Sequence, residues 1–561
     1  MNPEHRACRL IPSLLIAVAL AGCGTVIAPR PGPDAGPEAG PDAGPDAGPD
    51  AGPDAGPDAG SDAGPDAGPD AGPDAGPVLD VTASVLQHHK HANRDGLTVD
   101  PAYTHAMAQA LTRDMSFDGT ITGNVHAQPL YAASANGGAD LVVVATEANQ
   151  LTALNAATGL PVWQRGADTL GAAVQSNTLP CGNIAPLVGV TGTPIIDAAS
   201  RTIYFDALTT PDSGTTKRHL VYGLSLDDGS TRAGFPVDVQ AKLGSTFSSD
   251  MQGERGALAI AGRTLFVPYG GLAGDCGSYR GWVVGIPLDD PQSVRSWSTR
   301  AQGGGIWAPG GISSDGVSIH VSTGNTFGAT SWSDGEGIFR FPATGTLIPA
   351  DSFAPANWKA LDNADLDLGG VSPLPVHVAG ATPADVILAL GKDGNAYVLS
   401  QSSLGGIGGQ LSKTQVSSNE IITAPAVYPA PGGLTVVFPG PAVGATDSTH
   451  CPGTLTALRL TATTPPRAQA SFCMDQQFPT SVPLNGAPMA TSSGGAETPL
   501  VWTVGAEADN RLRAFDGETG VVVYAGGGAN EQMGSVERFQ TPIAARGRIF
   551  VAGNGKVYAF H

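Results

Sequence analysis

The chain has 561 residues, including 77 Gly and 46 Pro, and its formal net charge at pH 7 is −21. Its 29 Lys and Arg residues form no cluster, which excludes the basic surface that nucleic-acid-binding proteins need. Ten Asp and one Glu lie within residues 31–77, so about half of the net charge belongs to one low-complexity segment. Roughly 480 residues follow that segment, which is too many for one ordinary layered core and suits one large repetitive fold.

Residues 1–23 have the features of a signal segment for export. Arg6 and Arg9 precede a short apolar run at residues 14–20, and this run is too short to span a membrane. The following Leu-Ala-Gly-Cys resembles the bacterial lipobox, which implies cleavage before Cys23 and lipidation of its thiol. The alternative is a plain signal peptide cut at the small residues before the Cys. Because Gly24 rather than Asp follows, we expect a lipid anchor in the outer membrane or at the cell surface.

Residues 24–77 are dominated by a four-residue repeat, Gly-Pro-Asp-Ala. Pro at every fourth position removes hydrogen-bond donors and Gly removes side chains, so this segment cannot form a core. A collagen helix is excluded because it needs Gly at every third position. We therefore predict a disordered, extended tether.

Residues 78–115 form an irregular entry segment. Its first part contains three histidines, His88, His89 and His91. They could bind a metal, but no ligand pattern of known geometry accompanies them, and a flexible polar surface stretch is the favoured interpretation. Asp100 and Pro101 then predict the start of a short helix that ends at Leu111.

Residues 141–163 show the local pattern that the rest of the chain repeats. The sequence LVVVATEANQLTALNAATGLPVW contains three short apolar stretches separated by turn residues. Turn residues at this spacing are incompatible with a helix. The stretch therefore predicts a small antiparallel sheet, which needs neighbours to cover its faces.

Comparable units recur along the chain, and most begin at a Pro. Seven such positions are Pro129, Pro194, Pro309, Pro373, Pro425, Pro488 and Pro542. The long gap after Pro194 holds an eighth unit at residues 256–260, which lacks the Pro. The last unit ends at His561 without its outer strand, and residues 116–125 can supply one. Residues 116–561 therefore predict an all-β fold, an eight-bladed β-propeller of four-stranded antiparallel blades closed by an N-terminal strand.

Four of the six cysteines remain once Cys8 leaves with the signal and Cys23 takes lipid. This even number in an exported protein predicts two disulfides. Cys451 and Cys473 flank one hairpin-like stretch, which leaves the pair Cys181 and Cys276. The alternative is a four-thiolate zinc site, although no C-x-x-C spacing supports it.

Several motifs resemble the eight-bladed quinoprotein propellers, the fold of pyrroloquinoline quinone dehydrogenases and of related assembly-scaffold lipoproteins. The resemblance covers residues 116–561. Trp307 in GGGIW is similar to the Trp beneath the quinone in those enzymes, and Asn325 in VSTGN to a Ca²⁺ ligand. Lys392 in GKDGNAY resembles a basic residue that contacts the quinone. Asp275 stands near the place of a carboxylate ligand to Ca²⁺, one position out of register.

The chain also departs from that family. The adjacent Cys-Cys pair of the alcohol dehydrogenases is missing, with only Cys181 in that neighbourhood. The general-base Asp has no clean counterpart, because Asp334 and Glu336 are nearby but out of frame. We further expect the Cys276 disulfide to hold Asp275 away from the other site residues, which leaves an incomplete cation shell.

These departures favour a membrane-anchored binding or scaffold module with a degenerate quinone pocket. No cofactor is then expected, and the partner would be a protein or a small molecule, not nucleic acid. The alternative is a Ca²⁺-dependent pyrroloquinoline quinone alcohol or sugar dehydrogenase. In that case Trp307 and Lys392 hold the quinone, and Asp275 and Asn325 hold the cation. Trp307 also has a plain interpretation as packing between blades, and Lys392 as a charge at a hairpin tip.

Overall fold

The computed structural model describes residues 78–445, 455–474 and 485–561. The signal segment with Cys23, the tether and Cys451 lie outside the described residues. Within them, no helix is long and apolar enough to cross a membrane.

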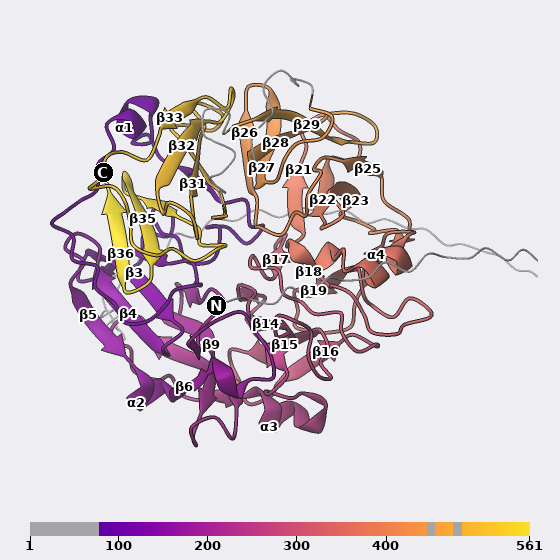
Figure 1. Ribbon diagram of the computed structural model, residues 1–561, viewed down its shortest axis with the longest axis horizontal. Coiled ribbons are helices and arrows are strands. Elements are labelled where there is room, and N and C mark those ends of the chain that lie inside the picture. Colours follow the sequence, from indigo (N-terminus) through magenta and orange to yellow (C-terminus); the bar gives the residue numbers. More distant parts are fainter. Residues whose placement is uncertain (1–77, 446–454, 475–484) are drawn as a thin grey trace, which may run out of the picture. The chain divides into compact units, whose positions relative to one another are not determined.

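Eight small sheets follow one another around the body, as predicted for a propeller (Figure 1). The first four comprise these strands: sheet 1, β2 (Leu130–Asn136), β3 (Ala139–Thr146), β4 (Gln150–Asn155) and β5 (Pro161–Arg165); sheet 2, β6 (Ala172–Gln175), β7 (Leu187–Val188), β8 (Ile195–Asp197), β9 (Thr202–Thr210), β10 (Arg218–Ser225) and β11 (Val237–Asp238); sheet 3, β12 (Gln252–Gly253), β13 (Ala259–Ala261), β14 (Thr264–Gly271), β15 (Trp282–Pro287) and β16 (Arg295–Ser298); sheet 4, β17 (Ser313–Ser314), β18 (Ser318–Ser322), β19 (Ile338–Pro342), β20 (Asp351–Ala354) and β24 (Gly406–Ile407).

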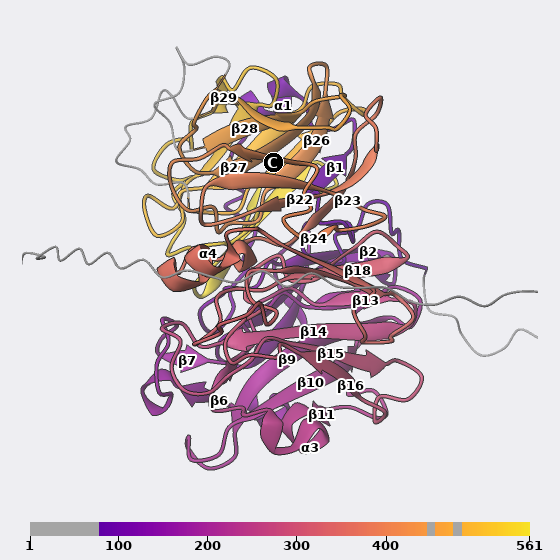
Figure 2. The same cartoon turned by 90° about the vertical axis from the view of Figure 1, so that its right-hand side faces the viewer.

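The other four sheets continue the same order. Their strands are: sheet 5, β21 (Leu374–His377), β22 (Asp385–Leu390), β23 (Asn395–Ser400) and β25 (Ser412–Gln415); sheet 6, β26 (Ala426–Ala430), β27 (Gly433–Pro439), β28 (Leu455–Leu460) and β29 (Ala468–Cys473); sheet 7, β1 (Leu97–Val99), β30 (Met489–Ser492), β31 (Leu500–Val504), β32 (Leu512–Asp516) and β33 (Val522–Tyr524); sheet 8, β34 (Ile543–Ala545), β35 (Arg548–Gly553) and β36 (Lys556–Phe560). Figure 2, turned by 90°, shows strands of neighbouring sheets lying one above another.

Helices are short and lie in the connections. They are α1 (His105–Gln109), α2 (Ala167–Leu170), α3 (Val239–Leu243) and α4 (Trp358–Ala364), with 3₁₀ turns at Ser176–Thr178, Gly244–Thr246 and Leu368–Gly370. The helix predicted to begin at Asp100 begins later, because Thr104 is its N-cap and its side chain accepts a bond from Met107 N. Asp100 instead accepts from Ala102 N in the preceding turn.

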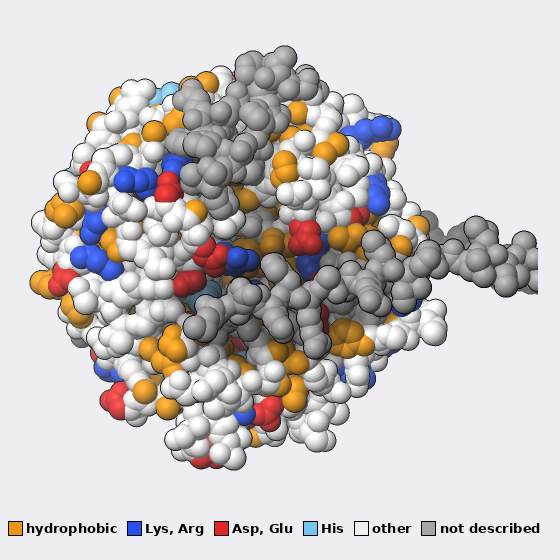
Figure 3. Space-filling model, viewed as in Figure 1, with side chains coloured by type: hydrophobic (Ala, Val, Ile, Leu, Met, Phe, Trp, Pro, Cys, Tyr) orange, Lys and Arg blue, Asp and Glu red, His pale blue; other side chains and the backbone are white. Residues whose placement is uncertain are grey.

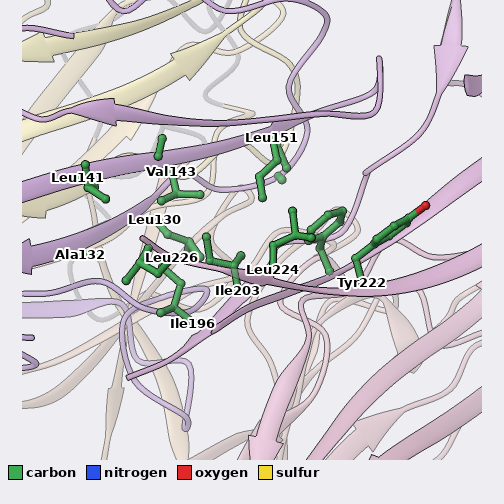
Figure 4. Packing of buried hydrophobic residues seen from close by; sticks show 14 of the residues in the cluster. Leu130, Ala132, Leu141, Val143, Leu151, Ile196, Ile203, Tyr222, Leu224 and Leu226 are labelled. Atoms are coloured by element: carbon green, nitrogen blue, oxygen red, sulfur yellow. The ribbon is translucent and has the colours of Figure 1, made fainter. Parts of the chain in front are cut away.

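Each sheet is buried against its neighbours through alternating apolar side chains. In sheet 1, Val143 of β3 pairs with Ala153 of β4, and both are buried. Figure 4 shows apolar side chains of sheet 1, such as Val143 and Leu151, facing Ile203 and Leu224 of sheet 2. Because a two-sided sheet cannot cover itself, this face-to-face packing around a ring is what stabilises the repeats.

The ring closes between the two ends of the described chain, as predicted. Residues 112–121 run beside β36, and Thr112 and His561 exchange two backbone hydrogen bonds of 2.9 and 3.0 Å. Asp114 N donates to Ala559 O at 2.9 Å, and Val557 N donates to Gly119 O at 2.8 Å. An N-terminal segment thus completes the three-stranded sheet 8.

Residues 85–98, here called the ring segment, contact all eight sheets near their first strands. The contacts, in order of the sheets, are Val85 N to Tyr131 O, Ile196 N to Leu86 O, Arg94 Nη2 to Leu258 O, Ser314 N to Ala92 O, Asn93 Nδ2 to Pro375 O, Val427 N to Asp95 O, Ala490 N to Gly96 O, and Thr98 Oγ1 to Ala544 O. The prediction of a flexible surface stretch is therefore wrong. His88 and His89 are buried and stacked at 4.4 Å, and Arg94 is buried among carbonyl groups.

The predicted Cys181–Cys276 disulfide is present, with a Cα–Cα distance of 6.1 Å. Cys473 is also disulfide-bonded, while its expected partner Cys451 lies outside the described residues. A zinc site made of all four thiolates is excluded, because a disulfide sulfur is not a thiolate ligand.

Candidate functional site

A cavity of about 250 Å³ lies where residues of several sheets converge, here called the axial cavity. Trp307, Lys392 and Asp275 line it together, although they come from separate units of the sequence. Such convergence places the cavity near the centre of the propeller. Figure 3 shows Lys, Arg, Asp and Glu side chains gathered near the middle of one face of the molecule.

The carboxylate of Asp367 is the centre of the polar network at this cavity. Its Oδ2 accepts from Trp307 Nε1 at 3.1 Å and lies 2.7 Å from Lys392 Nζ. Its Oδ1 accepts from the backbone N of Asn325 at 2.8 Å. Burial raises the pKa of Asp367, although the Lys392 ammonium acts in the opposite direction. The structure thus joins three of the predicted residues through a carboxylate that the sequence analysis did not select.

Lys392 lies between two carboxylates and an aromatic ring. Besides Asp367, its Nζ bonds Asp365 Oδ1 at 3.0 Å, and it lies 5.3 Å from the centre of the Trp307 ring. Burial alone would lower the pKa of Lys392, but Asp367 and Asp365 outweigh it and the pKa is raised. Lys392 therefore remains charged and is not a free hairpin-tip charge.

Asn325 is close to the cavity through its backbone. It stands after β18, and the N–H of Asn325 is the group that binds Asp367. Asn325 is not among the residues that line the cavity, whereas Asp275 is. The predicted pair of cation ligands is therefore not brought together as a preformed shell.

Asp275 lies in the cavity wall, so the prediction that the disulfide holds it away is wrong. The loop that carries it turns back at Asp275, whose φ is 53°, and Tyr279 donates to Asp275 Oδ1 at 2.6 Å. The disulfide at Cys276 anchors this loop beside the cavity. Gly274 lines the cavity and lies against this disulfide, because a Cβ built on Gly274 would be 3.6 Å from Cys181 Sγ.

Glu254 is a second acidic residue that the sequence analysis missed. It lines the cavity with only 6% of its surface exposed. Its Oε2 accepts from Gly192 N at 3.0 Å, while Oε1 has no hydrogen-bond partner. Burial raises the pKa of Glu254 well above its ordinary value, and Asp206 adds to this shift. A buried carboxylate with a free oxygen is suited to a cation or a hydrogen-bond donor of a ligand.

Asp334 and Glu336, the out-of-frame candidates for a general base, do not line the cavity. Asp334 is bound by the Arg300 guanidinium at 2.7 Å. Glu336 is buried, and its Oε2 accepts from Leu368 N at 2.7 Å. Burial, with a further contribution from Asp367, raises the pKa of Glu336 to about 9. Glu336 thus holds the backbone of Leu368, the residue that follows Asp367.

The lining of the axial cavity is net acidic. Four acidic side chains, those of Glu254, Asp275, Asp365 and Asp367, outnumber three basic ones, those of Lys392, Arg255 and His219, although the raised pKa of Glu254 reduces its negative charge. Such a cavity attracts cations and disfavours a free anion. Among the described residues, however, no three His, Cys, Asp or Glu side chains are grouped closely enough to hold a metal ion by themselves. A cation here needs further oxygen ligands from water or from a bound molecule.

No family model matches the chain, and no curated protein matches it. Its fold does match solved structures. The quinohemoprotein alcohol dehydrogenase of Comamonas testosteroni has a TM-score of 0.55 and 13% identity, over 85% of this chain and 80% of that one. Alcohol dehydrogenase ADHIIG of Pseudomonas putida HK5 has a TM-score of 0.59 and 11% identity, over 85% and 79%. A europium-containing methanol dehydrogenase has a TM-score of 0.57 and 13% identity, over 85% and 90%. At these identities the similarity shows the quinoprotein-like propeller fold and nothing further.

Proposed function

We propose that the axial cavity binds a quinone of the pyrroloquinoline quinone class together with a divalent cation, and that the protein oxidises an alcohol or sugar there. The observation that carries this proposal is the buried Asp367 carboxylate, held by Trp307, Lys392 and Asn325 at the cavity. This differs from the binding or scaffold module that the sequence favoured. That interpretation rested on the missing Cys-Cys pair, a displaced Asp275 and a missing base; the Cys-Cys pair is absent, but the structure has Asp275 and Asp367 in the cavity wall.

The residues at the cavity fit such a group in charge and shape. The Trp307 indole offers a flat surface, and Lys392 offers a cation beside it. The unpaired Oε1 of Glu254 and the carboxylate of Asp275 are oxygen ligands that a hard cation prefers. Because the lining is acidic, an anionic quinone needs the cation to offset repulsion. Quinone binding should therefore depend strictly on the cation.

Asp367 is the group that would accept the hydroxyl proton of the substrate. Its burial raises its pKa, which improves a carboxylate as a base. Trp307 and Lys392 hold it in one orientation. The bound quinone would supply a two-electron oxidant.

The test is reconstitution of the purified protein with Ca²⁺ and pyrroloquinoline quinone. Calorimetry should show quinone binding only with Ca²⁺ present, and dye reduction should follow addition of one member of an alcohol and sugar panel. Asp367→Asn should keep quinone binding and lower turnover by roughly a hundredfold or more, as expected when a general base is lost. Arg467→Gln, at an exposed residue, is the matched control. Absence of quinone binding with and without Ca²⁺ would instead favour the binding or scaffold module.

A further inference from the structure

A second, smaller cavity adjoins the axial cavity. It has a volume of about 50 Å³ and shares four wall residues with the larger one, namely Asn183, Ile184, Thr191 and Arg255. A water molecule needs roughly 10–15 Å³ of such volume. The second cavity therefore has room for a few heavy atoms.

Arg255 is a residue of this cavity whose guanidinium has no ion-pair partner among the described residues. Its Nη2 donates to Asn183 Oδ1 at 2.8 Å, and no described carboxylate oxygen lies within ion-pair distance of its guanidinium. The residue is half-buried, and burial lowers the pKa of Arg255. The Glu147 carboxylate acts in the opposite direction, and the nearby Arg538 guanidinium lowers this pKa further. A partly desolvated guanidinium near a second one is a favourable place for an anion.

The acidic residues around the cavity are engaged elsewhere. Arg538 binds both carboxylate oxygens of Glu507, at 3.0 and 2.9 Å from its Nε. Glu537 accepts from Asn554 Nδ2 at 2.6 Å and lies 3.9 Å from His126 Nε2.

Glu147 accepts from Gly189 N through Oε2 at 2.7 Å, and its Oε1 lies 2.9 Å from His126 Nδ1 without forming a hydrogen bond. None of these three carboxylates forms an ion pair with the Arg255 guanidinium among the described residues, although the charge of Glu147 raises the pKa of Arg255 and partly offsets its burial.

His88 gives an independent indication that a ligand belongs here. It lines the second cavity, is only 2% exposed, and its Nδ1 has no hydrogen-bond partner. A buried polar atom without a partner costs free energy unless a bound group satisfies it. In the tautomer with a proton on Nδ1, His88 has an unused donor in the wall of the cavity that Arg255 also lines.

We propose that the second cavity binds a small carboxylate, held by the Arg255 guanidinium and the His88 imidazole. A planar carboxylate matches the two parallel donors of a guanidinium, and its size matches the cavity. Because Arg255 lines both cavities, this carboxylate is either a free small ion or the end group of a longer molecule whose body occupies the axial cavity. The proposal does not depend on quinone binding.

The experiment is calorimetric titration of the full chain, free of quinone and Ca²⁺, with formate and separately with benzoate. Chloride keeps the ionic strength constant, because non-specific charge effects would otherwise contribute. Formate tests a free small ion, and benzoate tests an end group with an aromatic body near Trp307. Arg255→Gln should weaken binding roughly tenfold or more, since a charge-assisted pair is lost. Arg255→Lys should weaken it less, and Arg467→Gln should leave it unchanged.

Circular dichroism and thermal unfolding must first show that each variant is folded. If Arg255→Gln does not fold, Asn183→Ala is the second test. Asn183 is exposed, lines the second cavity and accepts a hydrogen bond from Arg255, so its loss should weaken carboxylate binding severalfold without unfolding the protein. Failure of both formate and benzoate to bind, or equal binding by the wild type and the folded Arg255 variants, would overturn the proposal.

Discussion

Asp367 and Lys392 form a largely buried ion pair at the axial cavity. Their side chains are 5% and 11% exposed. Lys392→Met should therefore destabilise the protein by about 3 kcal/mol, because it leaves the Asp367 carboxylate without its cation. Chemical denaturation gives this free energy of unfolding. The loss should be accompanied by a rise in the pKa of Asp367.

A double-mutant cycle tests the coupling of this pair. Asp367→Asn combined with Lys392→Met should recover much of the stability that Lys392→Met loses, since no unpaired charge then remains. If the two substitutions are simply additive, the pair is not coupled and Asp365 is the main partner of Lys392.

Glu336 makes a pH-dependent contribution to stability. Burial first, and Asp367 second, raise its pKa from 4.5 to about 9. Between these values the folded protein keeps a proton that the unfolded chain has lost, so this contribution falls as pH rises. Glu336→Gln should therefore show a smaller loss of stability than the wild type from about pH 5 to about pH 9. Denaturation midpoints across this range check it, with exposed Glu497→Gln as control.

The site residues show how far sequence reasoning reaches. Trp307, Lys392 and Asn325 were selected from motifs, and they do meet in space. Asp367 was missed because nothing local marks it, since its partners stand 60 and 42 residues away. The burial of Arg94 was missed for the same reason, because its acceptor Ile312 O, just before β17, is 218 residues distant.

Among the elements, the ring segment has a role that its sequence does not show. The repeated apolar strands predicted the sheets, since a period-two pattern is local. The polar ring segment instead acquires its structure from hydrogen bonds to both the carbonyl and the N–H groups of the sheets. Arg94 is 1% exposed and donates five hydrogen bonds, two of them to Ile312 O and one to Leu258 O. It therefore ties sheets 3 and 4 together.

Arg94→Met should destabilise the protein by about 3 kcal/mol or more. The substitution preserves much of the side-chain volume but leaves buried carbonyl groups without donors. Urea denaturation measures the change, and Arg467→Met, at an exposed residue, should differ from the wild type by less than about 0.5 kcal/mol. A loss for Arg94→Met as small as that of the control would mean that water replaces the lost donors.

At the scale of the whole molecule, we propose that the chain is exported and anchored through lipid on Cys23, with residues 24–77 as a spacer. Cys23 lies outside the described residues, so this rests on the resemblance to a lipobox. Cys23→Ser should move the protein from the membrane fraction to the soluble fraction, because stable attachment would lose its acyl chains. Cys8→Ser is the matched control. Retention of the Cys23 variant in the membrane fraction would refute the anchor.

The closure of the propeller decides whether its eight sheets unfold as one unit. Phe560 of β36 is fully buried and lies beside the N-terminal segment that completes sheet 8. Since each sheet is covered only by its neighbours, loosening this junction exposes faces of sheets 7 and 1 as well. Phe560→Ala should therefore cost roughly 3–5 kcal/mol and lower the midpoint of a single cooperative transition. Ile407→Ala, at a residue that is 53% exposed, should have little effect.

Hydrogen exchange provides the decisive comparison. If amide exchange in the Phe560→Ala variant is faster than in the wild type in β31 and β3 as well as in β35, the sheets of the closed ring unfold cooperatively. A separate early transition confined to residues 543–560 would show that sheet 8 unfolds independently.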